Sequence, residues 1–123
     1  MTAPNLISPS TITGKTTYLS LADTSETILL SNSSSSGKAL RVHSIYAANI
    51  DGTNAVSVTL KIYTAASGGT GYSLASTVSV PADSTIILVN KDAHIWLEED
   101  RRLTITATAG GDLNVICSYE EIS

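Results

Sequence analysis

The chain has 123 residues, enough for one domain with a single core but not for two. Hydrophobic residues make up 42% and charged residues only 15%, so we expect a folded domain and not a disordered chain. Seven Lys and Arg against eleven Asp and Glu give a net charge of -4, which offers no general attraction to phosphates. We therefore expect no nucleic-acid partner.

The first residues carry no pattern of an export signal or a membrane anchor. Residues 1–10 have neither a basic start nor an apolar stretch, and no apolar run in the chain approaches the ~18 residues of a membrane span. The single Cys117 cannot form an internal disulfide. We expect a protein made in a cytoplasm, with no membrane partner.

Residues 1–15, MTAPNLISPSTITGK, hold two prolines and no sustained apolar period. This predicts an extended N-terminal arm before a single sandwich domain over residues 16–123. The arm from Thr2 to Thr13 has no face to bury in its own domain, so we expect it to contact a neighbouring molecule. The expected contact residues are Thr2, Ala3, Pro4, Asn5, Leu6, Ile7, Ser8 and Pro9.

The segments TYLSL and ETILL, on either side of ADTS, predict two strands and a turn, and SNSSSSGK at residues 31–38 predicts a surface loop. Next come two runs whose apolar residues share one parity, which predicts two strands with one buried face each. Their apolar positions are Leu40, Val42, Tyr46, Ala48 and Ile50, then Val56, Val58, Leu60 and Ile62. Residues 51–54, Asp-Gly-Thr-Asn, supply turn chemistry, so we expect these two strands to form a hairpin.

The rest of the chain continues as short strands and turns. The expected turns are AASGGTG, Pro81-Ala82-Asp83, EDRR and GGD. The expected strands are YSLASTVSV, STIILVN, HIWLEE, LTITATA and LNVICSYEEI. Leu103, Ile105 and Ala107 are expected to point inward. About eight strands predict an all-β, antiparallel sandwich, jelly-roll-like with an immunoglobulin-like sandwich as the alternative. The immunoglobulin Cys-Trp-Cys pattern is absent, which favours the jelly roll.

No motif for catalysis emerges. TGKTT lacks the earlier glycine and the following helix of a phosphate-binding loop, and His43 and His94 lack a second ligand at metal-site spacing. Cys117 shares parity with apolar neighbours, so we expect a core residue and not a nucleophile. Residues 98–102, Glu-Glu-Asp-Arg-Arg, fit a solvated turn with offsetting charges better than an ion site. We expect no catalytic, cofactor-binding or metal-binding residue and no enzyme.

Trp96 is the one tryptophan, beside five tyrosines and no phenylalanine. Sugar-binding sandwiches stack sugars on exposed aromatic rings, so a glycan-binding protein is an alternative, with Trp96 and the loop at residues 65–71 as its site. A core or interface position is the more common one for such a residue. We expect Trp96 to be a surface contact residue.

Several stretches resemble small virion structural proteins of tailed bacteriophages, particularly phages of aquatic bacteria. The similarity runs from about Glu26 to the C-terminus, and its most distinctive parts are NIDGTNA, LASTVSVPADST, WLEE and GDLNVICSYEEIS. These are turn and strand patterns without a catalytic motif.

The resemblance implies a β-sandwich present in the virion. The leading expectation is a capsid decoration (cement) protein that binds the outside of the major capsid shell as a homotrimer and stabilises it, with the major capsid protein and copies of itself as partners. A neck, tail or fibre-associated module is the alternative within the virion. No cofactor is implied.

Overall fold

The computed structural model describes residues 3–123, which form nine strands and one short 3-10 helix, η1 (Lys91–Ala93). The strands are β1 (Ile12–Leu21), β2 (Thr27–Asn32), β3 (Ala39–Asn49), β4 (Val56–Tyr63), β5 (Gly71–Val80), β6 (Thr85–Val89), β7 (Ile95–Leu97), β8 (Arg101–Ala107) and β9 (Leu113–Ile122). No helix in this part of the chain is long and apolar enough to span a membrane.

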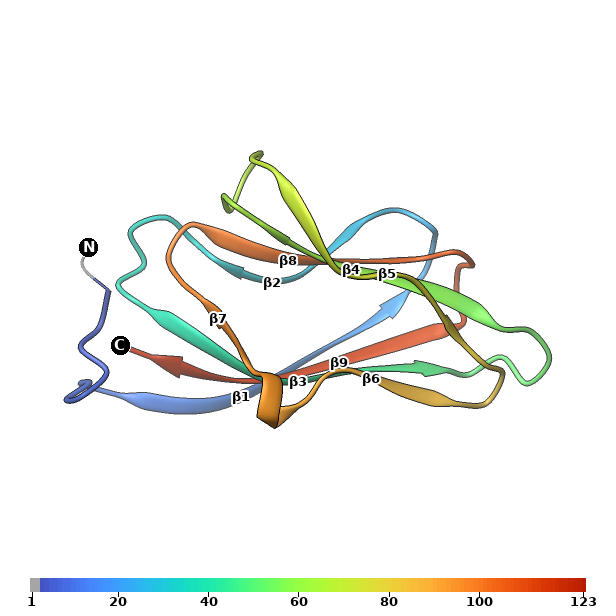
Figure 1. Ribbon diagram of the computed structural model, residues 1–123, viewed down its shortest axis with the longest axis horizontal. Coiled ribbons are helices and arrows are strands. Elements are labelled where there is room, and N and C mark those ends of the chain that lie inside the picture. The colour runs from blue at the N-terminus through green and yellow to red at the C-terminus, as the bar shows by residue number, and fades with distance from the viewer. Residues whose placement is uncertain (1–2) are drawn as a thin grey trace.

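The strands form two antiparallel sheets that pack face to face (Figure 1). The first sheet has the order β1-β9-β3-β6, with β7 also paired to β3, and the second has the order β2-β8-β4-β5. Among consecutive strands of residues 3–123, only β4 and β5 pair with each other. The first sheet has five strands and the second has four; without the short β7, the remaining eight strands are divided between the sheets in the order of a jelly roll. The predicted antiparallel sandwich is confirmed, with the jelly-roll topology of the two alternatives.

The predicted hairpin across residues 51–54 is wrong. β3 lies in the first sheet and β4 in the second, so this loop crosses between the sheets. Its local chemistry is as expected, because the Asp51 carboxylate accepts hydrogen bonds from the backbone N–H groups of Thr53 (2.8 Å) and Asn54 (3.2 Å). Such bonds shape a turn, but packing of the two apolar faces decides which strand the chain pairs with next.

The predicted alternation along β3 fails in its second half. A β-bulge shifts the register between Val42 and Ser44, and the extra residue swaps the two faces of the strand beyond it. Leu40 and Val42 are buried as expected, but Ile45 then enters the core. The predicted core residues beyond the bulge turn toward the surface: Tyr46, Ala48 and Ile50.

Between the sheets lies one apolar core. The predicted inward residues of β8, Leu103, Ile105 and Ala107, are at most 2% exposed, and Cys117 is fully buried, so these predictions are confirmed. Val56, Val58 and Leu60 of β4 are buried as well. Completely buried aliphatic side chains each contribute on the order of 1.5–3 kcal/mol to folding.

Candidate interaction surfaces

The N-terminal arm is shorter than predicted, because β1 begins at Ile12 and pairs with β9 from its first residue. Thr11 joins the other end of the chain through two backbone hydrogen bonds with Ser123, both 3.0 Å, so the arm leaves the sandwich beside the C-terminus (Figure 1). Of the predicted contact residues, Thr2 lies outside the described residues. The others, Ala3, Pro4, Asn5, Leu6, Ile7, Ser8 and Pro9, all lie in the arm.

Asn5 shapes the arm into a turn. Its side chain accepts a hydrogen bond from the backbone N–H of Ile7 (3.0 Å), and its carbonyl accepts one from Ser8 (3.2 Å). This turn presents Leu6 at 52% exposure and Ile7 at 95%. Two large apolar side chains are therefore displayed outside the core.

Trp96 is 42% exposed on β7. It lies directly opposite Arg41 of β3, whose guanidinium carbon is 6.0 Å from the ring centre, and the His94 ring meets it edge-on at 5.9 Å. β7 and β1 are at opposite edges of the first sheet, with β9 and β3 between them. The structure thus places Trp96 on the surface but does not bring it together with β1, from which the arm extends.

Four apolar side chains cross the outer face of the first sheet in one row. Tyr18 of β1 lies opposite Ile116 of β9, Ile116 opposite Tyr46 of β3, and Tyr46 opposite Ile87 of β6. Tyr18 is 76% exposed and Ile87 60%. A shallow hollow of about 310 Å³ adjoins Tyr18 and Ile116. We call these four residues the apolar row. The row was not predicted from the sequence, because its alignment depends on the β3 bulge and on the strand order, and neither has a local sequence signal.

One end of the first sheet carries a small ionic cluster. Glu121 of β9 accepts from Lys15 of β1 and from Lys38, each with an N–O distance of 3.1 Å. Hydrogen bonds from Lys15 and then Lys38 lower the pKa of Glu121 below its usual range. Such a three-membered cluster holds the β1 end and the β2–β3 loop together.

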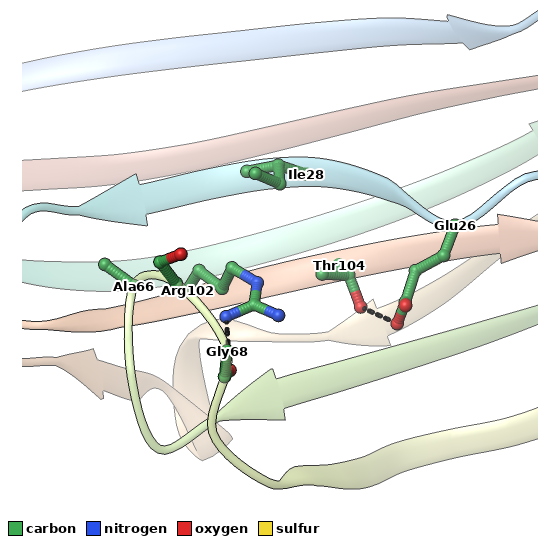
Figure 2. Close-up of a pocket in the computed structure, with 7 residues that line it drawn as sticks. Glu26, Ile28, Ala66, Gly68, Arg102 and Thr104 are labelled. Atoms are coloured by element: carbon green, nitrogen blue, oxygen red, sulfur yellow. Dashed lines mark hydrogen bonds between the residues drawn. The ribbon is translucent and has the colours of Figure 1, made fainter.

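A polar hollow of about 260 Å³ lies on the second sheet, beside the β4–β5 loop (Figure 2). Arg102 of β8 donates to the carbonyls of Ala65 (2.7 Å) and Gly68 (2.8 Å) and stacks 3.8 Å above the ring centre of Tyr63. Glu26 accepts from Tyr63 and Thr104, both 2.7 Å, and these bonds lower its pKa. Arg102 therefore holds the loop, and Glu26 links β4 to β8.

The histidines, the cysteine and the acidic turn residues do not gather as one site in the described part of the chain, and the contacts they make are structural. His43 contacts Glu120 at 2.6 Å, and burial raises the pKa of Cys117 to about 12. In the charged turn, Glu98 pairs with Arg101 at 3.4 Å and Asp100 accepts from the N–H of Ala66, which fits the predicted offset of charges. Within residues 3–123, no three His, Cys, Asp or Glu side chains gather as a metal site would require.

The comparisons with known proteins support the fold. No protein-family model matches the chain, and no curated protein is found to be similar. One solved structure with a similar fold comes from work titled "Bacillus endospore appendages form a novel family of disulfide-linked pili". Its TM-score is 0.53 at 18% sequence identity, over 92% of this chain and 88% of that one. At this identity the match shows a shared sandwich architecture alone.

Proposed function

We propose that this chain is a structural protein of a bacteriophage virion, of the type that decorates the outside of the major capsid shell and stabilises it. The observation that carries the proposal is the arm, which displays Leu6 and Ile7 in water beside a sandwich whose own core is complete. A folded domain gains nothing from such exposure, whereas a partner surface would bury both side chains. The resemblance to virion proteins gives the partner class.

The jelly roll would act as a rigid body in this role, and the arm as its attachment. Residues 3–11 carry no charged side chain, so their contact with a shell would depend on apolar burial and backbone hydrogen bonds more than on salt-sensitive ion pairs. Three copies around a local threefold axis would engage the shell together. Each arm buries little area, but simultaneous engagement multiplies the effective affinity.

The pilus likeness bears on this proposal only in a general way. The similar structure comes from disulfide-linked pili, which are assemblies of many subunits. In the present chain the single Cys117 is fully buried, so an assembly of this protein would be held by noncovalent contacts. A neck, tail or fibre-associated module would use the same surfaces in fewer copies, and copy number separates it from decoration.

Glycan binding is a second candidate, favoured by the exposure of Trp96 beside His94 and Arg41. Sugars stack on such rings, and polar neighbours can donate to their hydroxyls. Because Trp96 is the single tryptophan, its fluorescence would report a bound sugar directly. Unchanged emission across a glycan panel would remove this candidate.

The test of the proposal is binding to purified shells that lack the protein. A variant without residues 2–10 keeps the Thr11–Ser123 pairing and should unfold at the same denaturant concentration as the full chain. It should co-sediment with shells far less, as should a variant with both Leu6→Ser and Ile7→Ser. The matched control, Ser76→Ala with Ser79→Ala on the exposed face of β5, lies outside the arm and should bind normally. Undiminished binding of the arm-deleted protein would contradict the proposal.

A further inference from the structure

Within residues 3–123, no strand pairs with the outer edge of β1 in the first sheet. β1 forms one end of the order β1-β9-β3-β6, and β9 pairs with one side of it only. The hydrogen-bonding pattern tells which backbone groups face outward. Thr11 and Ser123 exchange two N–H to C=O bonds, and the register then runs without a shift from Ile12 opposite Ile122 to Leu21 opposite Leu113.

Hydrogen-bonded pairs alternate along an antiparallel ladder, so the odd-numbered residues of β1 bond to β9. The bond from the N–H of Gly111 to the carbonyl of Leu21, at 2.7 Å, agrees with this assignment at the other end. The N–H and C=O groups of the even-numbered residues therefore face the free edge. These residues are Ile12, Gly14, Thr16, Tyr18 and Ser20, and all five are exposed.

The other sheet edges carry features that block strand addition. β2 has six residues and a register shift, β6 has five and a shift, and β5 has two shifts and a left-handed Thr77 at φ 50°. Short strands, bulges and inward-directed charges protect natural edges from pairing. β1 has ten residues, no shift and no proline, and its one charge, Lys15, is bound to Glu121. A long, regular edge of this kind is suited to pairing with another strand.

We propose that β1 pairs antiparallel with β1 of a second copy, about a two-fold axis perpendicular to the first sheet. The edge is self-complementary, because a two-fold axis brings even-numbered residues opposite even-numbered residues and every outward donor meets an acceptor. The register with the greatest overlap places Thr16 opposite Thr16, Ile12 opposite Ser20, and Gly14 opposite Tyr18 of the second copy. In it the tyrosine ring covers a glycine, a favourable pair at sheet edges.

This pairing makes one continuous sheet from two sandwiches and puts both apolar rows on the same outer face. It does not rest on the proposed function, since it uses β1 and not the arm. In solution this pairing alone predicts a dimer; on a particle it would join copies at neighbouring threefold axes, where three copies come together only on the shell. Failure of shell binding would leave the pairing intact, and loss of the pairing would leave the arm contact intact, so the two proposals fail separately.

Gly14 offers a matched pair of variants to test it. A Cβ at Gly14 meets no atom within 4 Å, so Gly14→Ala fits the isolated sandwich. Proline is accepted in sheets at edge-strand positions whose N–H faces solvent, and Gly14 is such a position. Proline removes the N–H that faces the free edge and blocks the approach of a second strand, while the bonds of β1 to β9 remain. Alanine keeps the N–H. Light scattering should give twice 12.8 kDa for the unmodified protein and for Gly14→Ala, and 12.8 kDa for Gly14→Pro.

We expect the dimer dissociation constant to rise at least about a hundredfold in Gly14→Pro and to change less than about threefold in Gly14→Ala. Hydrogen exchange on the unmodified protein gives a second test, which does not depend on whether the Gly14→Pro variant folds. The amides of Gly14, Thr16 and Tyr18 should become protected as concentration rises, while those of Thr13 and Thr17 stay protected throughout. A monomer at millimolar concentration, fast exchange of the even-numbered amides in the oligomer, or an oligomer that survives Gly14→Pro would overturn the proposal.

Discussion

Asn49 at the end of β3 donates its side-chain N–H to the backbone carbonyl of Val80 on β5, at 3.0 Å. The bond links the two sheets, because β3 belongs to the first and β5 to the second. The same amide donates to the carbonyl of Asn54 at 2.9 Å, and its oxygen accepts from the N–H of Asp51 at 3.0 Å. Asn49 is 3% exposed, so its hydrogen-bonding groups are satisfied inside the protein.

Replacing Asn49 with alanine should lower the free energy of unfolding by about 1–3 kcal/mol, because it leaves the buried carbonyl of Val80 without a donor. Urea denaturation followed by circular dichroism measures the loss. Asn54→Ala is the matched control, since the Asn54 side chain is exposed, and it should cost less than about 0.5 kcal/mol. Equal losses of unfolding free energy in the two variants would show that the Asn49 side chain does not stabilise this end of the sandwich.

Asn32 performs the equivalent task as the last residue of β2, and β2 and β3 end at opposite ends of the sandwich (Figure 1). From β2 of the second sheet it donates to the carbonyl of Leu97 on β7 of the first sheet at 3.0 Å, and to that of Lys38 at 2.9 Å. Asn32→Ala should also cost about 1–3 kcal/mol. Because the two sites share no partner, the double variant with Asn49→Ala should show the sum of both costs within about 0.5 kcal/mol. A larger departure would mean that the two ends are coupled.

Cys117 should be unreactive in the folded protein. Burial raises the pKa of its thiol to about 12, so at pH of about 8 roughly one molecule in ten thousand carries the thiolate, and that sulfur is shielded by the core. Labelling with a thiol-specific reagent should be slow in buffer and complete within minutes in urea. Rapid labelling of the native protein would show that β9 leaves the core on that timescale.

The ionic cluster predicts a dependence of stability on pH. Lys15 and Lys38 hold the pKa of Glu121 below its ordinary value of 4.5, so the ionised carboxylate stabilises the folded state above that value, and the benefit is lost as pH falls through the lowered pKa. Glu121→Gln should therefore be less stable than the unmodified protein at neutral pH, and the gap should close in acid. Urea denaturation at both pH values measures this, and added salt should narrow the gap at neutral pH. A stability difference between the two proteins that does not change with pH would show that the Glu121 charge does not stabilise the fold.

The β3 bulge can be tested by two substitutions at adjacent positions. Ile45 is fully buried and Tyr46 belongs to the outer apolar row, so Ile45→Ala should cost about 2–5 kcal/mol and Tyr46→Ala less than half as much. Simple alternation from Leu40 predicts the reverse order. Urea denaturation of both variants decides between the two arrangements.

The features of this fold that the sequence predicts are those set by residues close together in the chain. Period-two alternation in β4 and β8 predicted Leu60, Leu103 and Ile105 in the core, because alternation is a local property of a strand. The strand partners were not predictable in this way. The turn at residues 51–54 is compatible with a hairpin or with a crossing between sheets, and only the packing of whole faces chooses the crossing.

The bulge near His43 likewise could not be predicted, because no Gly or Pro lies there to indicate it. This bulge is what turns Tyr46 outward. The exposed arm was predictable from its two prolines, but its length was not, since the pairing of Ile12 with Ile122 depends on the distant C-terminal strand. The apolar row and the free edge of β1 depend on that same long-range pairing.

The central claim, the proposal that this chain is carried in many copies on a phage capsid, is tested most directly by quantitative mass spectrometry of purified phage particles from the source of the chain. The measured quantity is the copy number of this chain relative to the major capsid protein. We predict near-equal abundance. A small fraction would indicate a neck, tail or fibre component, and absence from the particle would contradict the account.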